Sequence, residues 1–323
     1  MRTVVLVTLL GFVLIGCGAP DVPQNQGGTR ETAVKVAFVT NNASDFWKIA
    51  EAGTRKASAE NGCEVLFRIP PTGTAQEQQQ IVQDLVTLGV SGIAISPKDP
   101  DNQTAMLNQA AASVNLVTQD SDAPTSQRLC YVGTDNFEAG VAAGELIKNV
   151  LPEGGKIMLF VGTLDAQNAQ DRKKGIEKAL EGSAITIVDT RTDETDRLKA
   201  KENAQTALVA HPDLACLVGL WSYNGPAILS GVKASGNAGQ VKIVCFDEED
   251  ETLQGVKDGL IEGTIVQQPF EFGYRSVKLL FALAKDDHSM VPENKRIIIP
   301  VKTITSENVD VFWAELKEQT GKS

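Results

Sequence analysis

Polar and aromatic side chains follow several of the short apolar runs of this chain. Asp120 and Asp247, for example, each come directly after such a run. Carboxylates accept two hydroxyl hydrogens at once, guanidinium and carboxamide groups supply donors in a fixed plane, and aromatic rings cover apolar faces. Together these groups suit a guest that carries hydroxyls on an apolar ring, as a sugar does. The candidate ligand-binding residues of these types are Asp120, Asn168, Arg172, Asp247, Gln267, Phe46, Trp47 and Trp221.

Each of these side chains also has a simpler interpretation. An Asp that follows a strand often caps the next helix, an alternative that applies to Asp120 and less well to Asp247. Arg172 lies in a charged stretch typical of a solvated helical face. Phe46 and Trp47 fit the core of a first helix as well as a binding loop. Aromatic residues make up only 5% of the chain, which favours the binding interpretation of the rings in these loops.

The sequence contains no pattern typical of a catalytic or metal centre. His211 and His288 lie in turn-like and polar surroundings, and no nucleophile elbow, HExxH motif or phosphate-binding glycine loop occurs. The acids from Glu248 to Asp250 are interpreted as the opening of a helix, where negative charge favours the dipole. We therefore expect a binding protein without metal or cofactor, and an exported carbohydrate-processing enzyme is the weaker alternative.

Four cysteines beyond the N-terminal region are widely spaced and lie in or beside apolar runs. The sequence positions are Cys63, Cys130, Cys216 and Cys245, and none forms a CxxC pair. Buried free thiols are the expectation, although a disulfide between two of them stays open.

The N-terminal residues have the pattern of an export signal. Arg2 is followed by an apolar run over residues 4–15, which is too short for a comfortable membrane span. The run ends in Leu-Ile-Gly-Cys17, which resembles the bacterial lipobox, so residues 1–16 are predicted to be removed and Cys17 to be acylated. An ordinary signal peptide with an incidental cysteine is the alternative. Residues 17–33 lack apolar periodicity and are predicted to be a flexible tether.

The charge balance excludes one class of partner. The whole chain carries 30 basic and 41 acidic residues, a net charge of −11. Removal of residues 1–16 takes away Arg2 alone and leaves a net charge of −12. Such an acidic surface repels nucleic acid, and no basic cluster compensates for it.

From residue 34 onward, short β-branched runs alternate with amphipathic helical stretches. This alternation is typical of parallel sheets covered by helices on both faces, and about 290 residues exceed what one core usually organises. Ligands of such sheets bind where the loops leave the carboxyl ends of the strands. The expected strands are residues 34–39, 63–69, 92–96, 115–118, 130–132, 156–161, 185–190, 215–219, 241–246, 264–266 and 296–304.

Over residues 34 to 309 the chain resembles the ribose-type periplasmic sugar-binding proteins of ABC importers, also called type I solute-binding proteins. Its best-matching segments are Val-Cys-Phe-Asp247 and Thr-Ile-Val-Gln267-Gln-Pro. The resemblance implies that Asp247 and Gln267 contact the ligand. Four residues of the opening loop fall where that family's contacts lie, with a serine in place of the usual asparagine: Thr40, Ser44, Phe46 and Trp47.

Other positions depart from the pattern of that family. Asp120 matches an acid that grips sugar hydroxyls, but the arginine that often follows it is Ser121 here. The segment from Asn168 to Gly175 keeps the family's Arg172, although a second arginine is replaced by Gln170. Trp221 stands where many members carry Asn or Asp. These departures leave the identity of the sugar or polyol open.

The resemblance also implies the architecture. We expect an α/β protein with two doubly wound parallel-sheet lobes joined by a three-strand hinge, with crossings near Asp135, Gln267 and Ile297. The predicted N-terminal lobe comprises residues 34–134 plus 268–296, and the predicted C-terminal lobe comprises residues 135–267 plus 297–318.

The function implied by the resemblance is that of a substrate-binding lipoprotein of an ABC importer. It would capture a sugar or polyol by lobe closure and deliver it to a membrane permease. The expected protein is a monomer in the periplasm or cell envelope, held to the membrane by its lipid alone. A sensory sugar-binding protein that docks on a membrane receptor is the alternative. A repressor of the lactose-repressor type would need an N-terminal helix-turn-helix, where this chain has an export signal.

Overall fold

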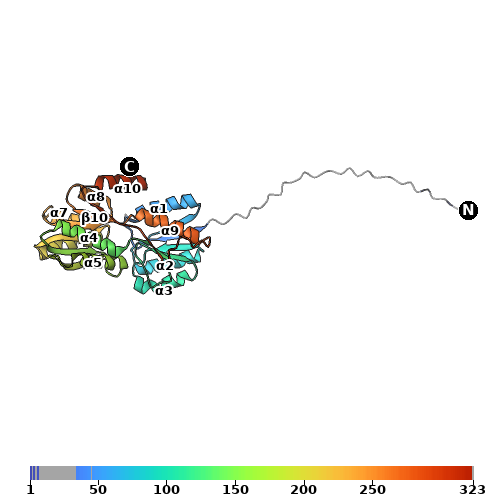
Figure 1. Cartoon of the computed structure of the whole chain (residues 1–323). Helices are drawn as coiled ribbons and strands as arrows, with labels where there is room; N and C mark the ends of the chain where they lie inside the picture. Colours follow the sequence, from blue (N-terminus) through green and yellow to red (C-terminus); the bar gives the residue numbers. More distant parts are fainter. Residues whose placement is uncertain (2, 4–5, 7–33, 45, 322–323) are drawn as a thin grey trace. The chain divides into compact units, whose positions relative to one another are not determined.

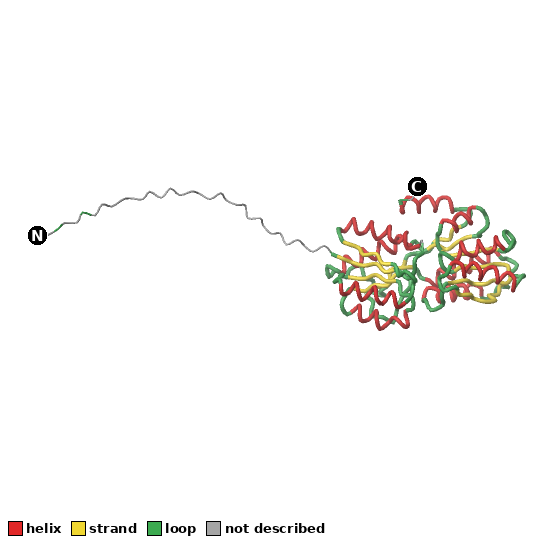
Figure 2. Tube along the Cα trace, turned by 180° about the vertical axis from the view of Figure 1, so that it is seen from behind, coloured by secondary structure: helices red, strands yellow, loops and turns green. Residues whose placement is uncertain are grey.

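The fold contains two six-stranded sheets, each with helices on both faces (Figures 1 and 2). The structure is a computed structural model that describes residues 1, 3, 6, 34–44 and 46–321. The predicted tether and the predicted lipidation site Cys17 lie outside the described residues, as does most of the predicted signal peptide. The architecture confirms the predicted α/β fold with two sheets.

The first sheet has the strand order β11-β5-β4-β3-β1-β2, and every neighbouring pair is parallel. Parallel neighbours require crossover connections, which helices supply, except between β4 and β5, where a loop without a helix makes the connection. The strands are β1 (Lys35–Val39), β2 (Glu64–Arg68), β3 (Gly92–Ile95), β4 (Asn115–Gln119), β5 (Cys130–Gly133) and β11 (Arg296–Ile298).

The second sheet has the order β12-β10-β9-β8-β6-β7. All its pairs are parallel except β10 with β12, which is antiparallel. The strands are β6 (Gly155–Val161), β7 (Ile185–Thr192), β8 (Leu214–Gly219), β9 (Lys242–Phe246), β10 (Gly263–Val266) and β12 (Lys302–Ile304).

Each sheet and its helices form one lobe. The first lobe contains α1 (Phe46–Asn61), α2 (Ala75–Thr87), α3 (Pro100–Ala111) and α9 (Pro269–Leu283). The second lobe contains α4 (Asn136–Val150), α5 (Gln167–Leu180), α6 (Arg197–Ala210), α7 (Asn224–Ala234), α8 (Asp250–Lys257) and α10 (Val309–Thr320).

The last predicted strand, residues 296–304, is wrong as a single strand. Ile297 and Ile298 pair with β5 in the first sheet, whereas residues 302–304 pair with β10 in the second. Pro300 lies between the two segments and has no N–H to donate to a sheet, so the pairing is interrupted there. The third passage between the sheets therefore lies after Ile298. The predicted limits of the two lobes as domains stay a prediction.

The strands of the first sheet divide their side chains between two apolar layers. Val36 and Phe38 lie in the layer that contains α1 and α9. Ala37 and Val39 lie in the layer that contains α2 and α3. Because successive strand residues point to opposite faces, a run of consecutive apolar residues fills both layers at once.

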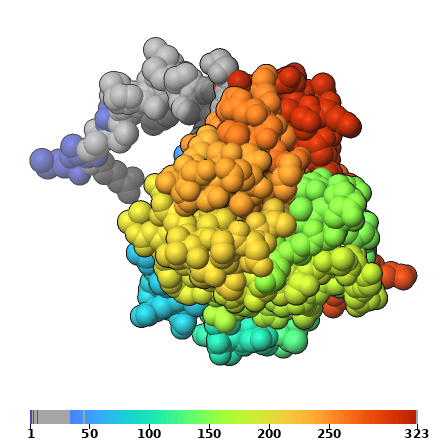
Figure 3. Space-filling model, turned by 90° about the vertical axis from the view of Figure 1, so that its left-hand side faces the viewer, coloured from blue at the N-terminus to red at the C-terminus, as the bar shows by residue number. Residues whose placement is uncertain are grey.

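One apolar cluster contains residues of both lobes. Val309 and Leu316 of α10 belong to the same buried cluster as Ile49 of α1 and Phe270 of α9. We call this group the seam cluster. Figure 3, which faces the end of the second lobe, shows the red C-terminal residues beside the orange segment that includes α8, the helix on which α10 also packs.

The described cysteines Cys63, Cys130, Cys216 and Cys245 are buried and free. Burial raises the pKa of all four thiols. Among the described residues, no helix combines the length and apolar character needed to cross a bilayer.

Helices α1 and α9 approach each other through two glycines. A Cβ atom on Gly53 would lie 2.0 Å from the carbonyl oxygen of Phe270, and one on Gly273 would lie 2.0 Å from that of Ala50. No side chain fits at either position without separation of the two helices.

We predict that Gly53→Ala lowers the free energy of unfolding by about 1–3 kcal/mol, because overpacking outweighs the helix propensity of alanine. Chemical denaturation measures the change. The control is Ala59→Gly at an exposed position of the same helix, which should cost only about 1 kcal/mol. A Gly53→Ala protein as stable as the wild type would contradict the close contact.

Candidate functional site

A polar cavity lies where loops at the carboxyl ends of strands of both sheets meet. Such loops are the usual place for ligands of open α/β sheets. The cavity is lined by Asn41, Asn42, Ser44, Phe46, Trp47, Asp120, Asn168, Arg172, Trp221, Ser222, Asp247 and Gln267.

All but one of the predicted ligand-binding residues line this cavity. The exception is Thr40, whose hydroxyl donates to the carbonyl of Asn42 (2.9 Å) and whose own carbonyl accepts from Gln78 Nε2 (2.8 Å). Thr40 shapes the loop and does not face the cavity, so its prediction as a ligand contact is not supported. The role of the others as ligand contacts stays a prediction.

Three lining residues were not predicted: Asn41, Asn42 and Ser222. They belong to the loops that follow β1 and β8, both of which the sequence had indicated as binding loops. Their polar character was the available signal. The sequence does not reveal toward which side of the loop each of these side chains turns.

Asp120 holds a carboxylate at the cavity from the first lobe. It follows β4 directly and adopts a left-handed conformation with φ 59°. Its Oδ2 atom accepts from Ser96 Oγ (2.7 Å), Asn41 Nδ2 (3.3 Å) and, across the cavity, Asn168 Nδ2 (3.4 Å). Asp120 therefore caps no helix, and the alternative interpretation is wrong. Burial raises its pKa, and Arg172 opposes that rise.

Asp247 is the counterpart from the second lobe. It follows β9 directly, again in a left-handed conformation (φ 69°), which Asp tolerates better than most residues. Its Oδ1 accepts from Gln267 Nε2 (2.7 Å), and its Oδ2 lies 3.9 Å from Arg172 Nη1. Burial raises the pKa of Asp247 to about 6 against the attraction of Arg172.

Arg172 lies on α5 and is only 1% exposed, so it does not belong to a solvated helical face. Its Nη1 donates to the Leu220 carbonyl (2.5 Å), and its guanidinium carbon lies 4.5 Å from the centre of the Phe246 ring. The ring and the carbonyl fix the plane of the guanidinium. Nη2 has no hydrogen-bond partner among the described residues.

The aromatic residues of the cavity are also part of the cores. Phe46 and Trp47 contact each other edge to face, with ring centres 4.9 Å apart, and Trp47 Nε1 donates to Asn42 Oδ1 (3.2 Å). Both interpretations of these two residues, core and binding loop, therefore hold for their positions. Trp221 lies against Gly162, where a Cβ atom would come within 2.2 Å of the indole ring. The third tryptophan, Trp313, lies outside this cavity and is half-buried against the seam cluster.

Five buried polar atoms of the cavity lining have no partner within the described part of the chain. A buried polar atom without a partner costs free energy, so an accumulation of them at one cavity indicates a polar guest. A hydroxyl group both donates and accepts and suits such a mixed set. The three acceptors are Asn41 Oδ1, Asn168 Oδ1 and Gln267 Oε1, and the two donors are Arg172 Nη2 and Trp221 Nε1.

The acidic run after Asp247 opens a helix as predicted for Glu249, the N-cap residue of α8, and for Asp250, its first residue, but not for Glu248. Only Asp250 lies in α8, and Glu249 binds Arg197 through two hydrogen bonds (2.7 and 3.0 Å). Glu248 is 3% exposed and lines two cavities together with Ile49 of α1 and Leu316 of α10. Its Oε2 has no partner among the described residues. Glu248 is therefore a buried carboxyl that precedes the helix, and its interpretation as part of the helix opening is wrong.

Comparison with known proteins agrees with this geometry. The family model for the periplasmic binding protein domain matches residues 36–288. The ribose import binding protein of Bacillus subtilis is 25% identical over 309 residues, which cover 94% of this chain and 98% of that protein.

Two solved structures are similar in fold and sequence. One is an ABC transporter solute-binding protein from Burkholderia graminis in complex with D-arabinose, with a TM-score of 0.81 and 30% identity over 85% of this chain and 96% of that one. The other is a glucose-galactose binding protein from Geobacillus stearothermophilus, with a TM-score of 0.80 and 27% identity over 85% of this chain and 98% of that one.

The buried carboxyl of Glu248 predicts a pH-dependent cost to stability. Burial and the neighbouring Asp247 raise its pKa, and Arg172 opposes them. An acid whose pKa is higher in the folded than in the unfolded chain costs nothing below the unfolded pKa of about 4.3, and the cost grows as the pH rises toward the folded pKa. Glu248→Gln should therefore raise the Tm at pH 8 and change it little at pH 4.

Thermal unfolding at both pH values measures this difference. Glu249→Gln is the matched control, because it removes an acid that binds Arg197 and should lower the Tm slightly at pH 8. An equal gain in Tm for Glu248→Gln at pH 4 and pH 8 would show that its carboxyl is not a buried titrating group.

Proposed function

The chain belongs to the family of periplasmic binding protein domains, and we propose that it captures a neutral sugar or polyol for delivery to the permease of an ABC importer. The observation that carries this proposal is the set of unpartnered donors and acceptors that converge from both lobes on one cavity. The names of the relatives support it, since they are binding proteins for ribose, for D-ribose and D-allose, and for xylose and arabinose.

The proposed mechanism is closure of the two lobes around the ligand. Phe46, Trp47 and Asp120 come from the first lobe, whereas Arg172, Trp221 and Asp247 come from the second. Each lobe alone offers half of the contacts, so the ligand shifts the population toward the closed form that it bridges. The hydrogen bond between Asn168 and Asp120 already joins the two halves at the cavity.

The charges of the cavity favour a neutral ligand. Two carboxylates, Asp120 and Asp247, face a single guanidinium, that of Arg172. The two positions at which the resemblance would place further arginines are Ser121 and Gln170. An anionic sugar would bring a third negative charge into a buried site with one cation, which is unfavourable.

We further propose that the protein acts outside the cytoplasm as a lipid-anchored monomer. The apolar run of residues 4–15 and the following Leu-Ile-Gly-Cys17 support export and acylation, and the polar residues up to 33 would serve as a tether. The proposed role is binding without chemical conversion of the sugar.

A thermal-shift panel tests this function. The panel contains D-ribose, D-arabinose, D-allose, D-xylose, D-glucose, D-galactose, D-tagatose and myo-inositol, with D-glucuronate as the anionic control. A ligand at 100 times its Kd stabilises by about 2.7 kcal/mol, so at least one neutral compound should raise the Tm by about 5 °C and D-glucuronate should not. Mass spectrometry should recover the bound compound unchanged. No shift with any neutral member, or a chemically altered sugar, would contradict the proposal.

We predict that Asp247→Asn and Trp221→Ala each weaken binding of the panel's best sugar by about 1–3 kcal/mol. Asparagine tolerates the left-handed backbone of Asp247, so this variant removes the negative charge without added strain. Trp313→Phe is the control, because Trp313 packs outside the cavity and its replacement should leave Kd unchanged. Calorimetry measures the three affinities, and an unchanged Kd for a cavity variant would remove that residue from the site.

A further inference from the structure

Asn136 is the first residue of α4 and follows the first passage of the chain from one lobe to the other. Its side chain is 6% exposed and does not line the ligand cavity. The preceding residue, Asp135, caps the helix and accepts from the backbone N–H of Glu138. Because Asp135 caps the helix, the carboxamide of Asn136 is not needed for that purpose.

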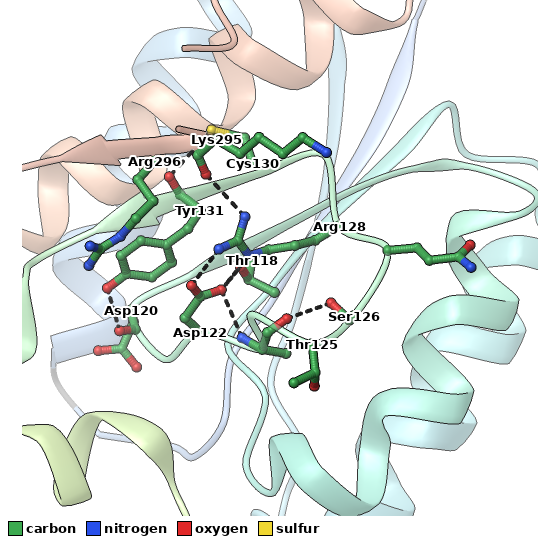
Figure 4. A network of polar contacts seen from close by, with 12 residues as sticks. Thr118, Asp120, Asp122, Thr125, Ser126, Arg128, Cys130, Tyr131, Lys295 and Arg296 are labelled. Atoms are coloured by element: carbon green, nitrogen blue, oxygen red, sulfur yellow. Dashed lines mark hydrogen bonds and ion pairs between the residues drawn. The ribbon is translucent and has the colours of Figure 1, made fainter. Parts of the chain in front are cut away.

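The amide nitrogen of Asn136 contacts the backbone of the first lobe. Nδ2 lies 3.1 Å from the carbonyl oxygen of Asp120 and 3.4 Å from the hydroxyl of Tyr131. That hydroxyl also donates to the Asp120 carbonyl (2.9 Å), a contact drawn as a dashed line in Figure 4. The Asp120 carbonyl therefore accepts from Asn136 Nδ2, and it shares the single hydroxyl hydrogen of Tyr131 with the Thr134 carbonyl (2.7 Å). Asn136 and Tyr131 are both buried.

These donors matter because of the conformation of Asp120. The residue is left-handed and lies between a strand and a loop, so its carboxylate is aimed by the orientation of its own peptide groups. Its N–H donates to the Val132 carbonyl (3.3 Å). Asn136 and Tyr131 contact its carbonyl oxygen.

The amide oxygen of Asn136 contacts the second lobe. Oδ1 accepts from Arg172 Nε at 3.0 Å. Together with the Leu220 carbonyl on Nη1 and the Phe246 ring on the guanidinium face, this bond holds the planar group on three sides. The remaining nitrogen, Nη2, is the one without a partner among the described residues, and Arg172 lines the cavity.

We propose that Asn136 is a positioning residue that couples the carboxylate of Asp120 to the guanidinium of Arg172 across the hinge. The Asn136 carboxamide donates to the backbone carbonyl of Asp120 and accepts from the side chain of Arg172. The two charged groups of opposite lobes are thereby held in one relative placement. Asn136 does not line the cavity and acts through these two residues.

The proposed role has two parts, the hydrogen bond donated to the Asp120 carbonyl and the hydrogen bond accepted from Arg172 Nε. Different substitutions remove one or both of them. Asn136→Leu has a similar volume and removes both the donor and the acceptor. Asn136→Asp keeps an acceptor for Arg172 Nε and removes the donor to the Asp120 carbonyl. Asn115→Leu is the matched control, since the Asn115 carboxamide donates to the Ser91 carbonyl within the first lobe (3.1 Å).

The first readout requires no ligand. In a ¹H–¹⁵N spectrum, the Nε–H signal of Arg172 is identified by its absence in Arg172→Lys, and its exchange with water is slow because the group is buried and bonded. We expect faster exchange by tenfold or more in Asn136→Leu, slow exchange in Asn136→Asp, and no change in Asn115→Leu. If Asn136→Leu does not fold, Asn136→Ser replaces it, because the shorter serine side chain cannot reach Arg172 Nε or the Asp120 carbonyl. An unchanged Arg172 signal in the variant that lacks the acceptor overturns the inference.

The second readout is affinity, and this part rests on the proposed function. For the panel sugar that stabilises the wild type most, Asn136→Leu should weaken binding by about ten- to a hundredfold, as for the loss of a buried hydrogen bond to a charged group. Asn136→Asp should also bind more weakly than the wild type, because the Asp120 carbonyl loses the amide donor of Asn136 and keeps only the shared hydroxyl of Tyr131. Affinity of Asn136→Leu equal to that of Asn115→Leu overturns the inference. A wild type that binds no sugar of the panel refutes the proposed function instead, and the Arg172 signal then still decides the role of Asn136.

Discussion

Two carboxylates and one guanidinium are buried together where the loops of the two sheets meet, and the surrounding structure compensates for their burial. A buried charge is costly unless it is paired and hydrogen-bonded. Asp120 receives donors from Ser96, Asn41 and Asn168, whereas Asp247 receives one from Gln267. These bonds are fewer than the groups can make, and the unused capacity faces the cavity. The site is thus organised enough to remain folded and incomplete enough to take a polar guest.

Much of the architecture could be predicted because the strands of a doubly wound sheet are buried on both faces. Runs such as residues 157–161 and 243–246 are continuously apolar and stand out from the helices that flank them. The prediction failed at residues 296–304, where one β-branched stretch serves two sheets. Periodicity alone cannot reveal that change of sheet. Pro300 was the local signal, since its missing N–H interrupts strand pairing.

The site was predicted at the level of loops and less well at the level of side chains. The rule that ligands bind at the carboxyl ends of parallel strands indicated the correct loops. Within the loop after β1, however, Thr40 turns away while Asn41 and Asn42 turn inward. The left-handed residues Asp120 and Asp247 redirect the chain in a manner that residue type does not disclose. Glu248 was interpreted as part of a helix opening. Its burial beside α10, which lies more than fifty residues away in the sequence, could not be predicted from the local pattern.

The seam cluster has a practical consequence for biosensor engineering. Because α10 packs on the second lobe and shares buried contacts with α1 and α9, the end of this helix lies beside the junction that lobe motion would alter. An environment-sensitive dye attached to a cysteine introduced at exposed Glu318 would move from one surrounding to another as the lobes part, without occupying the cavity. The C-terminal helix is therefore a suitable attachment point for an optical reporter of this molecule.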